Sequence, residues 1–224
     1  MAGKGTRMAK YYEGPKQLLP VLDKPICERV FDQLPSEVDG LVFVVGGPHE
    51  AKIREHFKAG EYGGRPIEFV RQEEQLGVAH AFWQARDLVQ GRWVGILPDD
   101  VYGDNSFEKM LEHELAILAY KVPNPESFGV LVADEAGYLM RSVEKPKEFV
   151  SDLVWTGAMV MDERFFEAKV EPSARGEYES PDVWMKLRQD FKARIKVVEA
   201  DLWLPVNDKP QLEEAERVLH SLGE

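Results

Sequence analysis

The chain has 224 residues, of which 44% are hydrophobic and 30% charged, proportions typical of a soluble globular protein with a sizeable core. Its formal net charge of −12 argues against a nucleic-acid surface, which relies on clustered cations, and no apolar run is long enough to span a membrane. The single cysteine, Cys27, excludes a disulfide within the chain and suits a cytoplasmic protein.

The first 125 residues alternate short apolar strands with amphipathic helices. Strands are expected at 41–45, 67–70 and 93–97, and helices at 26–31, 50–59, 77–89 and 107–120. This alternation predicts an α/β fold with a Rossmann-like, mainly parallel sheet flanked by helices.

The remaining residues have a different pattern. Strands separated by turns are expected at 128–132, 138–143 and 156–161, and an amphipathic helix at 211–222. No repeat or low-complexity linker interrupts the chain, so we expect a single domain over 1–224, with halves at 1–125 and 126–224.

Glycines and cations gather at the start of the chain. Gly3, Gly5 and Thr6 precede Arg7, and Lys16 follows within ten residues, with little acid between them. A short glycine loop exposes backbone N–H groups, and cations around it suit a polyphosphate. The loop matches neither a Walker phosphate loop nor a dinucleotide fingerprint, whose third glycine is replaced by Met8. A nicotinamide-dependent dehydrogenase is therefore disfavoured.

A longer pattern is more specific. Gly3-x-Gly5-Thr6-Arg7, followed by Pro15-Lys16-x-x-x-Pro20 and Lys24-Pro25, resembles the signature of the sugar-1-phosphate nucleotidylyltransferases, both the uridylyl and the thymidylyl branches. The resemblance implies a fold of the nucleotide-diphospho-sugar transferase type. It implies that Arg7 and Lys16 are catalytic. It also implies that Gly3, Gly5 and Thr6 bind the nucleotide.

The resemblance continues through the first half. Gln72 and Gly77 match the family's base-binding segment, in which the glutamine amide reads a pyrimidine edge. Asp99, in Leu97-Pro98-Asp99-Asp100, matches the metal-binding aspartate. His80, on the helix that follows Gly77, is interpreted as a packed histidine rather than a base.

The second half carries matches to the sugar-binding elements. Gly129, Glu144, Lys145 and Gly157 fall on them, with Glu144 and Lys145 expected to contact sugar hydroxyls and the sugar phosphate. The later segment 176–182 resembles another element of the family. In Val206-Asn207-Asp208 the asparagine matches a metal ligand of the N-acetylglucosamine-1-phosphate uridyltransferases, and Asp208 is kept in reserve.

The resemblance implies transfer of a nucleotidyl group from a nucleoside triphosphate, UTP or dTTP, to a sugar 1-phosphate, with Mg²⁺ as cofactor. Neither the sugar nor the oligomeric state follows from the sequence, and homo-oligomers are compatible with it. A sugar-nucleotide-binding or regulatory homologue with weak catalysis is the alternative, and a glycosyltransferase is a further one, although such enzymes typically carry an Asp-x-Asp pair. We also expect a central apolar strand ahead of Met1, truncated in this chain, and no fused acyltransferase domain.

Overall fold

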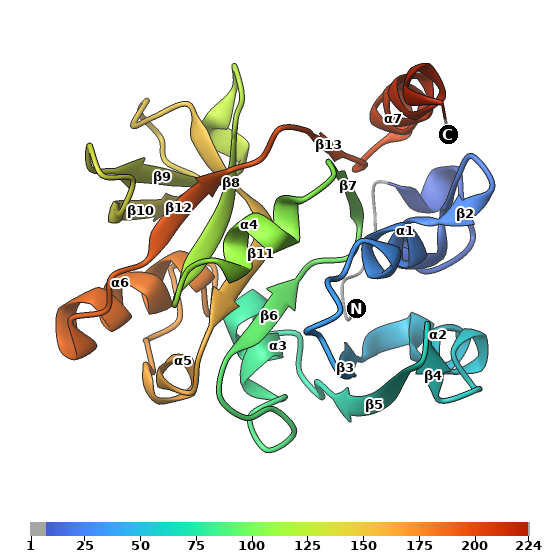
Figure 1. Ribbon diagram of the computed structural model, residues 1–224, viewed down its shortest axis with the longest axis horizontal. Coiled ribbons are helices and arrows are strands. Elements are labelled where there is room, and N and C mark those ends of the chain that lie inside the picture. Colours follow the sequence, from blue (N-terminus) through green and yellow to red (C-terminus); the bar gives the residue numbers. More distant parts are fainter. Residues whose placement is uncertain (1–7, 224) are drawn as a thin grey trace.

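The largest sheet lies at the centre of the protein, whose computed structural model describes residues 8–223 (Figure 1). Its strands are β6 (Trp93–Ile96), β8 (Ala116–Lys121), β9 (Gly129–Ala133), β10 (Leu139–Glu144), β11 (Leu153–Met161) and β12 (Lys196–Glu199). The order is β10-β9-β11-β8-β12, and β6 pairs with β11. Within this sheet β8 and β12 are parallel, whereas β11 is antiparallel to β6, β8 and β9.

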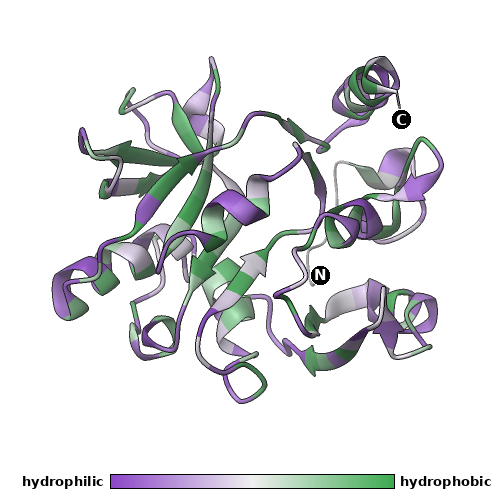
Figure 2. Cartoon of the chain, in the orientation of Figure 1, coloured by the Kyte–Doolittle hydropathy of each residue, from purple (hydrophilic) through white to green (hydrophobic). Residues whose placement is uncertain are grey.

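Helices cover both faces of this sheet, because its central strands are apolar on both sides. Along β8, Ala116 and Leu118 pack into one core with the helix α4 (Ser106–Leu111), and Ile117 and Ala119 pack into another. The second core includes α3 (Val78–Trp83), α5 (Arg164–Glu167) and α6 (Ser180–Phe191). Hydrophobic residues accordingly dominate these strands, and polar residues lie on the outer helix surfaces (Figure 2).

A second sheet has the order β3-β5-β4, with β3 (Leu41–Val45) parallel to β5 (Arg65–Arg71) and β4 (Glu61–Tyr62) at its edge. The helices η3 (Gly47–His49) and α2 (Glu50–His56) connect β3 to this edge. A cleft of about 980 Å³ is lined by β3 on one side and β6 on the other. Gln72, Gly77 and Asp99 are among the residues that line it.

The two ends of the described chain meet in a third region. It contains η1 (Met8–Lys10), η2 (Lys16–Leu18), β1 (Pro20–Val21), β2 (Lys24–Pro25), α1 (Ile26–Asp32), β7 (Asp100–Tyr102), β13 (Trp203–Pro205) and α7 (Lys209–Leu222). The pairs β1–β2 and β7–β13 are antiparallel. Val21, Val101 and Leu219 share one apolar cluster, so α7 packs on the N-terminal segment. A last short helix, η4 (Pro125–Ser127), precedes β9.

The α/β class is confirmed, but two expectations are wrong. The helix expected at 107–120 ends at Leu111, and Ala116–Lys121 forms β8. A continuous apolar run is compatible with a buried helix as well as with a central strand. Here the hydrogen-bonded pairing with β11 and β12 makes the segment a strand. The described pairs are also mostly antiparallel, since only β3–β5 and β8–β12 are parallel. Over residues 8–223, no helix is both long and apolar enough to cross a membrane.

Candidate active site

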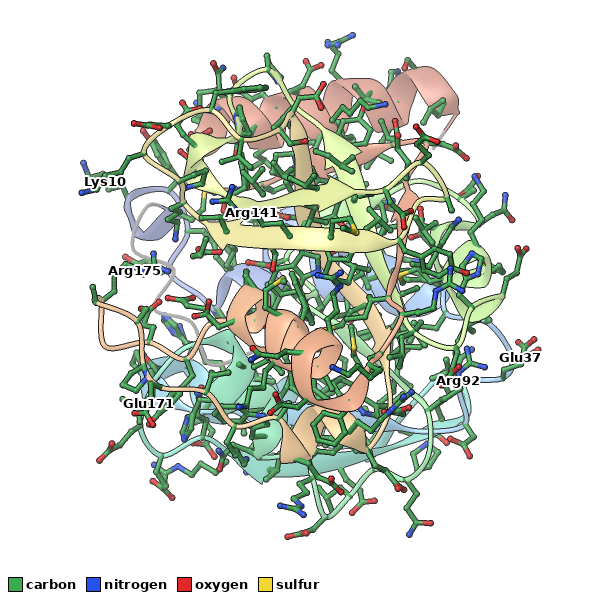
Figure 3. All side chains as sticks on the ribbon, turned by 90° about the vertical axis from the view of Figure 1, so that its left-hand side faces the viewer. Lys10, Glu37, Arg92, Arg141, Glu171 and Arg175 are labelled. Carbon is green, nitrogen blue, oxygen red and sulfur yellow. The ribbon has the colours of Figure 1, made fainter. Side chains whose placement is uncertain are left out.

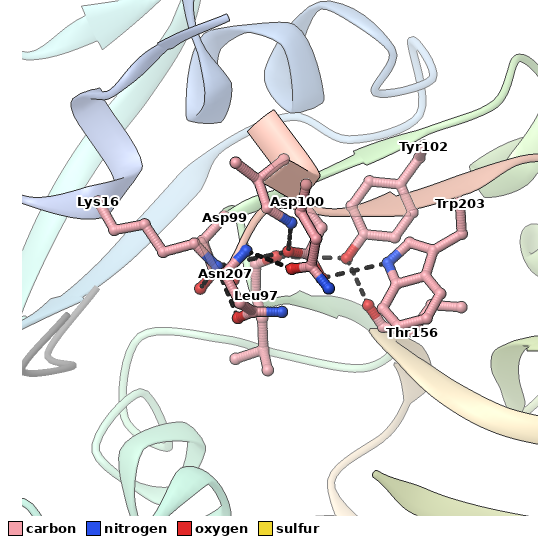
Figure 4. A network of polar contacts seen from close by, with 10 residues as sticks. Lys16, Leu97, Asp99, Asp100, Tyr102, Thr156, Trp203 and Asn207 are labelled. Atoms are coloured by element: carbon pink, nitrogen blue, oxygen red, sulfur yellow. Dashed lines mark hydrogen bonds and ion pairs between the residues drawn. The ribbon is translucent and has the colours of Figure 1, made fainter. Parts of the chain in front are cut away.

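The ammonium group of Lys16 stands at the centre of a cluster of oxygen atoms (Figure 4). Its Nζ lies 2.9 Å from Asp99 Oδ2, 3.4 Å from Asp100 Oδ1 and 3.2 Å from Asn207 Oδ1. Burial lowers the pKa of Lys16, but the two carboxylates outweigh burial, and the net pKa lies above its ordinary value. The lysine is therefore charged at neutral pH, and residues predicted from distant parts of the sequence meet around it.

Asp100 is the most enclosed member of this cluster. Its Oδ2 accepts a hydrogen bond from Trp203 Nε1 at 3.2 Å, and its Oδ1 accepts one from the Val206 backbone N–H at 3.0 Å. Burial and the neighbouring Asp99 raise the pKa of Asp100 to about 7. Since the protein supplies donors to both of its oxygens, Asp100 joins β7 to the loop after β13 rather than facing a ligand.

Asp99 is the more open carboxylate, with 29% of its side chain exposed against 13% for Asp100. It lines the cleft, whereas Asp100 does not. Of the two neighbours, Asp99 is thus the one open to the cleft, and its predicted role as a metal ligand stays a prediction.

Asn207 and Asp208 have separate tasks at the start of α7. Asp208 is the N-cap of the helix, since its Oδ1 accepts a hydrogen bond from Gln211 N at 3.0 Å. The Asn207 backbone N–H donates to Gln211 Oε1 at 2.7 Å, which orients the residue so that its side-chain oxygen faces Lys16. The structure therefore places Asn207, not the reserve residue Asp208, in the cluster.

The oxygens around Lys16 suit a hard divalent cation. Carboxylate and amide oxygens are ligands that Mg²⁺ accepts, and Mg²⁺ usually keeps waters and substrate phosphates in its shell. In residues 8–223 no three His, Cys, Asp or Glu side chains gather as a metal site. Asp99 and Asn207 come from different parts of the fold, and oxygens of both already contact the ammonium nitrogen of Lys16. These two oxygens therefore fit a cation bound next to Lys16.

Gln72 lines the same cleft as Asp99 and is buried, with 3% of the residue exposed. It follows β5, and its backbone N–H donates to Val45 O at 2.8 Å, which fixes its position next to β3. Its Nε2 donates to the Gly77 carbonyl at 3.2 Å and lies 2.9 Å from His80 Nδ1. The two predicted base-binding residues, Gln72 and Gly77, are therefore in direct contact.

Gly77 is a position where only glycine fits. Its φ is +104°, and a Cβ there would come within 2.6 Å of Tyr178 O and 2.8 Å of Tyr178 N. The close approach allows Tyr178 N to donate to Leu76 O and Ala79 N to donate to Tyr178 O. This backbone contact ties the start of α3 to the segment before α6, and so joins the two halves of the chain.

The residues expected to bind the sugar form a second cluster. Glu144 Oε1 lies 3.1 Å from Lys145 Nζ and 3.2 Å from Arg175 Nη2. A Cβ on Gly129 would come within 3.1 Å of Glu144 Oε2, so the glycine leaves room for the carboxylate. Arg175 is exposed and lies on the surface (Figure 3). The structure thus brings Gly129, Glu144 and Lys145 together as predicted.

Gly157 is placed differently. It lies in β11 with a φ of +99°, and its carbonyl accepts a hydrogen bond from Leu97 N at 2.8 Å. A Cβ there would lie 3.1 Å from both Leu97 Cβ and Tyr102 Oη. The described contacts therefore place Gly157 behind the loop that carries Asp99, where it supports that loop.

Two residues of these clusters were not predicted from the sequence. Four predicted residues lie outside the described part of the chain. The motif search missed Arg175 and Trp203 as members of the two clusters. Arg175 stands directly before the segment 176–182 and could have been found from that position, while the sequence carries no signal that Trp203 Nε1 donates to Asp100. Gly3, Gly5, Thr6 and Arg7 lie outside the described residues, so their roles stay predictions.

Comparison with known proteins shows the family of this chain. Residues 1–221 match the nucleotidyl transferase family, and the chain belongs to it. The UTP–glucose-1-phosphate uridylyltransferase AglF of Haloferax volcanii is 34% identical over 230 residues, which cover 97% of this chain and 93% of AglF. The bifunctional protein GlmU of Methanococcus vannielii is 34% identical over 200 residues. That match covers 85% of this chain and 47% of GlmU, so the chain spans about half the length of the GlmU relatives.

Two solved structures share the fold. A Bacillus anthracis protein described as a glucose-1-phosphate thymidylyltransferase, in complex with sucrose, superposes with a TM-score of 0.81 at 24% identity, covering 97% of this chain and 92% of its own. A UDP-glucose pyrophosphorylase in complex with UDP-glucose gives the same TM-score at 20% identity, with 98% and 96% covered. These likenesses confirm the Rossmann-like nucleotidyltransferase fold.

Proposed function

We propose that this protein transfers a nucleotidyl group from a nucleoside triphosphate, UTP or dTTP, to a sugar 1-phosphate. The observation that carries the proposal is the meeting of Asp99 and Asn207 oxygens on Lys16 Nζ, at the cleft that Asp99 and Gln72 both line. Membership of the nucleotidyl transferase family and the likeness to AglF support it.

In the proposed reaction, an oxygen of the sugar 1-phosphate attacks the α-phosphorus of the triphosphate. A new P–O bond forms, the bond from the α-phosphorus to the bridging oxygen breaks, and pyrophosphate leaves with that electron pair. No protein nucleophile is required, because the attacking phosphate is already an anion. The protein must bring two anions together and stabilise the charge that moves to the leaving group.

Each residue of the first cluster has a part in this reaction. Lys16, which is charged and buried, would neutralise the α-phosphate. Asp99 and Asn207 would hold Mg²⁺, which when bound offsets charge on the triphosphate oxygens. The carboxylates keep Lys16 protonated and oriented until the triphosphate arrives. Arg7 and the backbone at Gly3 to Thr6 would hold the β- and γ-phosphates.

The second cluster would bind the sugar 1-phosphate. Glu144 would accept hydrogen bonds from sugar hydroxyls, and Lys145 would neutralise the sugar phosphate. Lys145 has a φ of +44°, an uncommon conformation for a residue with a side chain, and it is exposed, so its ammonium can move from Glu144 to a ligand.

Pyrophosphate release tests the proposal, measured with UTP, dTTP, CTP and ATP against glucose, N-acetylglucosamine and mannose 1-phosphates in the presence of Mg²⁺. We expect turnover with at least one of these sugars, and with UTP or dTTP ahead of the other triphosphates. Calorimetry on the same pairs separates the alternative: binding of both substrates without pyrophosphate release would mean a sugar-nucleotide-binding homologue, not a transferase.

A further inference from the structure

His80 contacts the amide of Gln72 from the first turns of α3. Its Nδ1 lies 2.9 Å from Gln72 Nε2, and its ring stacks on Tyr178 with centroids 5.9 Å apart. Gln84 lies on the other side of the ring, with Nε2 at 3.3 Å from His80 Nε2. The imidazole is therefore held between two amides and an aromatic ring.

The direction of the Gln72 amide follows from its partners. A carbonyl oxygen can only accept, so the atom 3.2 Å from Gly77 O must be the amide nitrogen. The second hydrogen of that nitrogen points to His80 Nδ1, which must then be unprotonated and accept. Gly77 O and His80 Nδ1 thus take both hydrogens of the amide.

The tautomer of His80 follows in turn. A neutral imidazole carries one hydrogen, so if Nδ1 accepts from Gln72, the hydrogen sits on Nε2. The 3.3 Å contact between Gln84 Nε2 and His80 Nε2 is then not a hydrogen bond. Gln84 Nε2 donates instead to the His80 carbonyl on the same helix, at 3.0 Å.

What is left to meet a ligand is the oxygen of Gln72. Within the described residues, Oε1 accepts no hydrogen bond, and Gln72 lines the cleft. An amide whose two hydrogens are already donated can form a hydrogen bond to a base only by accepting one through its oxygen. Uracil and thymine offer a donor at N3–H, whereas N3 of cytosine is itself an acceptor.

We propose that His80 is a positioning residue, which together with the Gly77 carbonyl fixes the Gln72 amide so that its oxygen selects the N3–H of uracil or thymine over cytosine. The inference rests on the proposed function, since it takes the base of the triphosphate to lie at Gln72. It goes beyond that function in assigning the selectivity to the acceptor atom of a neighbouring histidine.

Two substitutions separate the acceptor from the ring. His80→Asn retains an acceptor at the position of Nδ1 and removes the ring that stacks on Tyr178. His80→Phe retains the stacked ring and removes the acceptor. In His80→Phe only the Gly77 carbonyl still holds the Gln72 amide, so turning the amide to offer its nitrogen to cytosine N3 costs one hydrogen bond fewer than in wild type. His220→Leu, at an exposed histidine near the end of α7, is the control.

The measurement is the ratio of kcat/KM for UTP to that for CTP at a fixed sugar 1-phosphate. We expect wild type, His80→Asn and His220→Leu to share one ratio, and His80→Phe to lower it by about tenfold, the effect of one hydrogen bond to a buried group. The change should appear in KM, with kcat for UTP within about twofold, because Lys16 and Asp99 are untouched.

An unchanged ratio in His80→Phe would overturn the proposal, and so would a ratio lowered equally in His80→Asn, since the acceptor atom would then carry no selectivity. If His80→Phe does not fold, His80→Leu replaces it and is judged by the same criterion. Should no triphosphate be turned over at all, the proposed function fails by itself. Equilibrium binding of UTP and CTP to the same variants then still tests the positioning role.

Discussion

The two polar clusters of this protein are built differently. The cluster around Lys16 is buried, and backbone and indole donors hold its members. The cluster around Glu144 is open: Lys145 and Arg175 have 47% and 40% of their side chains exposed. Charges in the buried cluster interact strongly and have little freedom, whereas exposed ion pairs are weak and screened by salt. The first arrangement suits charge stabilisation during a reaction, and the second suits recognition of a substrate by side chains that exchange partners.

The largest effect is expected from Asp99→Asn. The change removes a proposed metal ligand and one of the two carboxylates on Lys16, so pyrophosphate release should fall by about a hundredfold to a thousandfold, as for the loss of a charge-stabilising group in other active sites. The melting temperature should change little, since Asp99 is half-buried and its loss relieves repulsion with Asp100. Steady-state kinetics and thermal melts measure both quantities.

Asp87→Asn, at an exposed aspartate after α3, serves as the matched control and should turn over like wild type. Near-normal pyrophosphate release by Asp99→Asn would remove the buried cluster from the reaction.

A pH-dependent effect on stability is expected from Asp100. Its pKa is about 7 in the folded protein against 3.8 for an ordinary aspartate, so between these values the folded state binds more protons than the unfolded state. Its contribution to the free energy of unfolding is therefore fully present below about pH 4 and is lost as the pH rises through about 7, by up to a few kcal/mol. Denaturant unfolding of wild type and Asp100→Asn without Mg²⁺ should show the wild type losing stability relative to the variant over this range.

Asp104→Asn, at an exposed site two residues beyond the β7 position Tyr102, should leave the pH dependence of wild type unchanged. If wild type and Asp100→Asn instead give parallel curves, the Asp100 carboxyl titrates alike in both states, and the buried cluster is less constrained than its geometry indicates.

The open cluster should give an effect on substrate affinity. Glu144→Gln weakens one acceptor for sugar hydroxyls, so we expect KM for the sugar 1-phosphate to rise about tenfold with kcat and KM for the triphosphate nearly constant. Glu148→Gln, at an exposed glutamate in the following loop, is the control. A fall in kcat equal to the fall in kcat/KM would place Glu144 in the reaction itself and would erase the contrast between the clusters.

The smallest effect is expected from Arg175→Ala. Arg175 Nη2 lies 2.6 Å from Glu179 Oε1, but Ser173 Oγ also donates to that oxygen at 3.0 Å, so the glutamate keeps a partner. We expect a loss of about 1 kcal/mol or less in the free energy of unfolding, and a smaller loss at high salt. Lys186→Ala, which breaks the exposed pair with Asp190, gives a reference value. A much larger loss for Arg175→Ala would mean that the open cluster is structural.

The sequence predicted which side chains gather around Lys16, and the roles of these side chains stay predictions. Lys16, Asp99 and Asn207 were found from local motifs, because the chemistry of phosphate transfer requires particular residue types, and the structure brings all three together. Each of the three residues was identified within its own short motif, so their separation along the chain did not affect the prediction. Trp203 was missed because its partner Asp100 is set by tertiary packing alone, whereas Arg175 was missed although it directly precedes the segment 176–182.

Fold predictions failed where local pattern and tertiary pairing disagree. The segment 116–120 reads equally well as helix or buried strand, and α6 and β12 carried no signal that we used. The expectation of an apolar strand ahead of Met1 stays a prediction.

Phosphorus NMR of one reaction mixture tests the central claim most directly. Wild-type protein with Mg²⁺, UTP and a sugar 1-phosphate should consume the two substrates at equal rates and form a UDP-sugar and pyrophosphate in equal amounts. No product should form when either substrate is left out, and far less should form in the same time when Asp99→Asn replaces wild type. Release of inorganic phosphate in place of pyrophosphate, or no change in any UTP or dTTP mixture although both substrates bind, would contradict nucleotidyl transfer by this site.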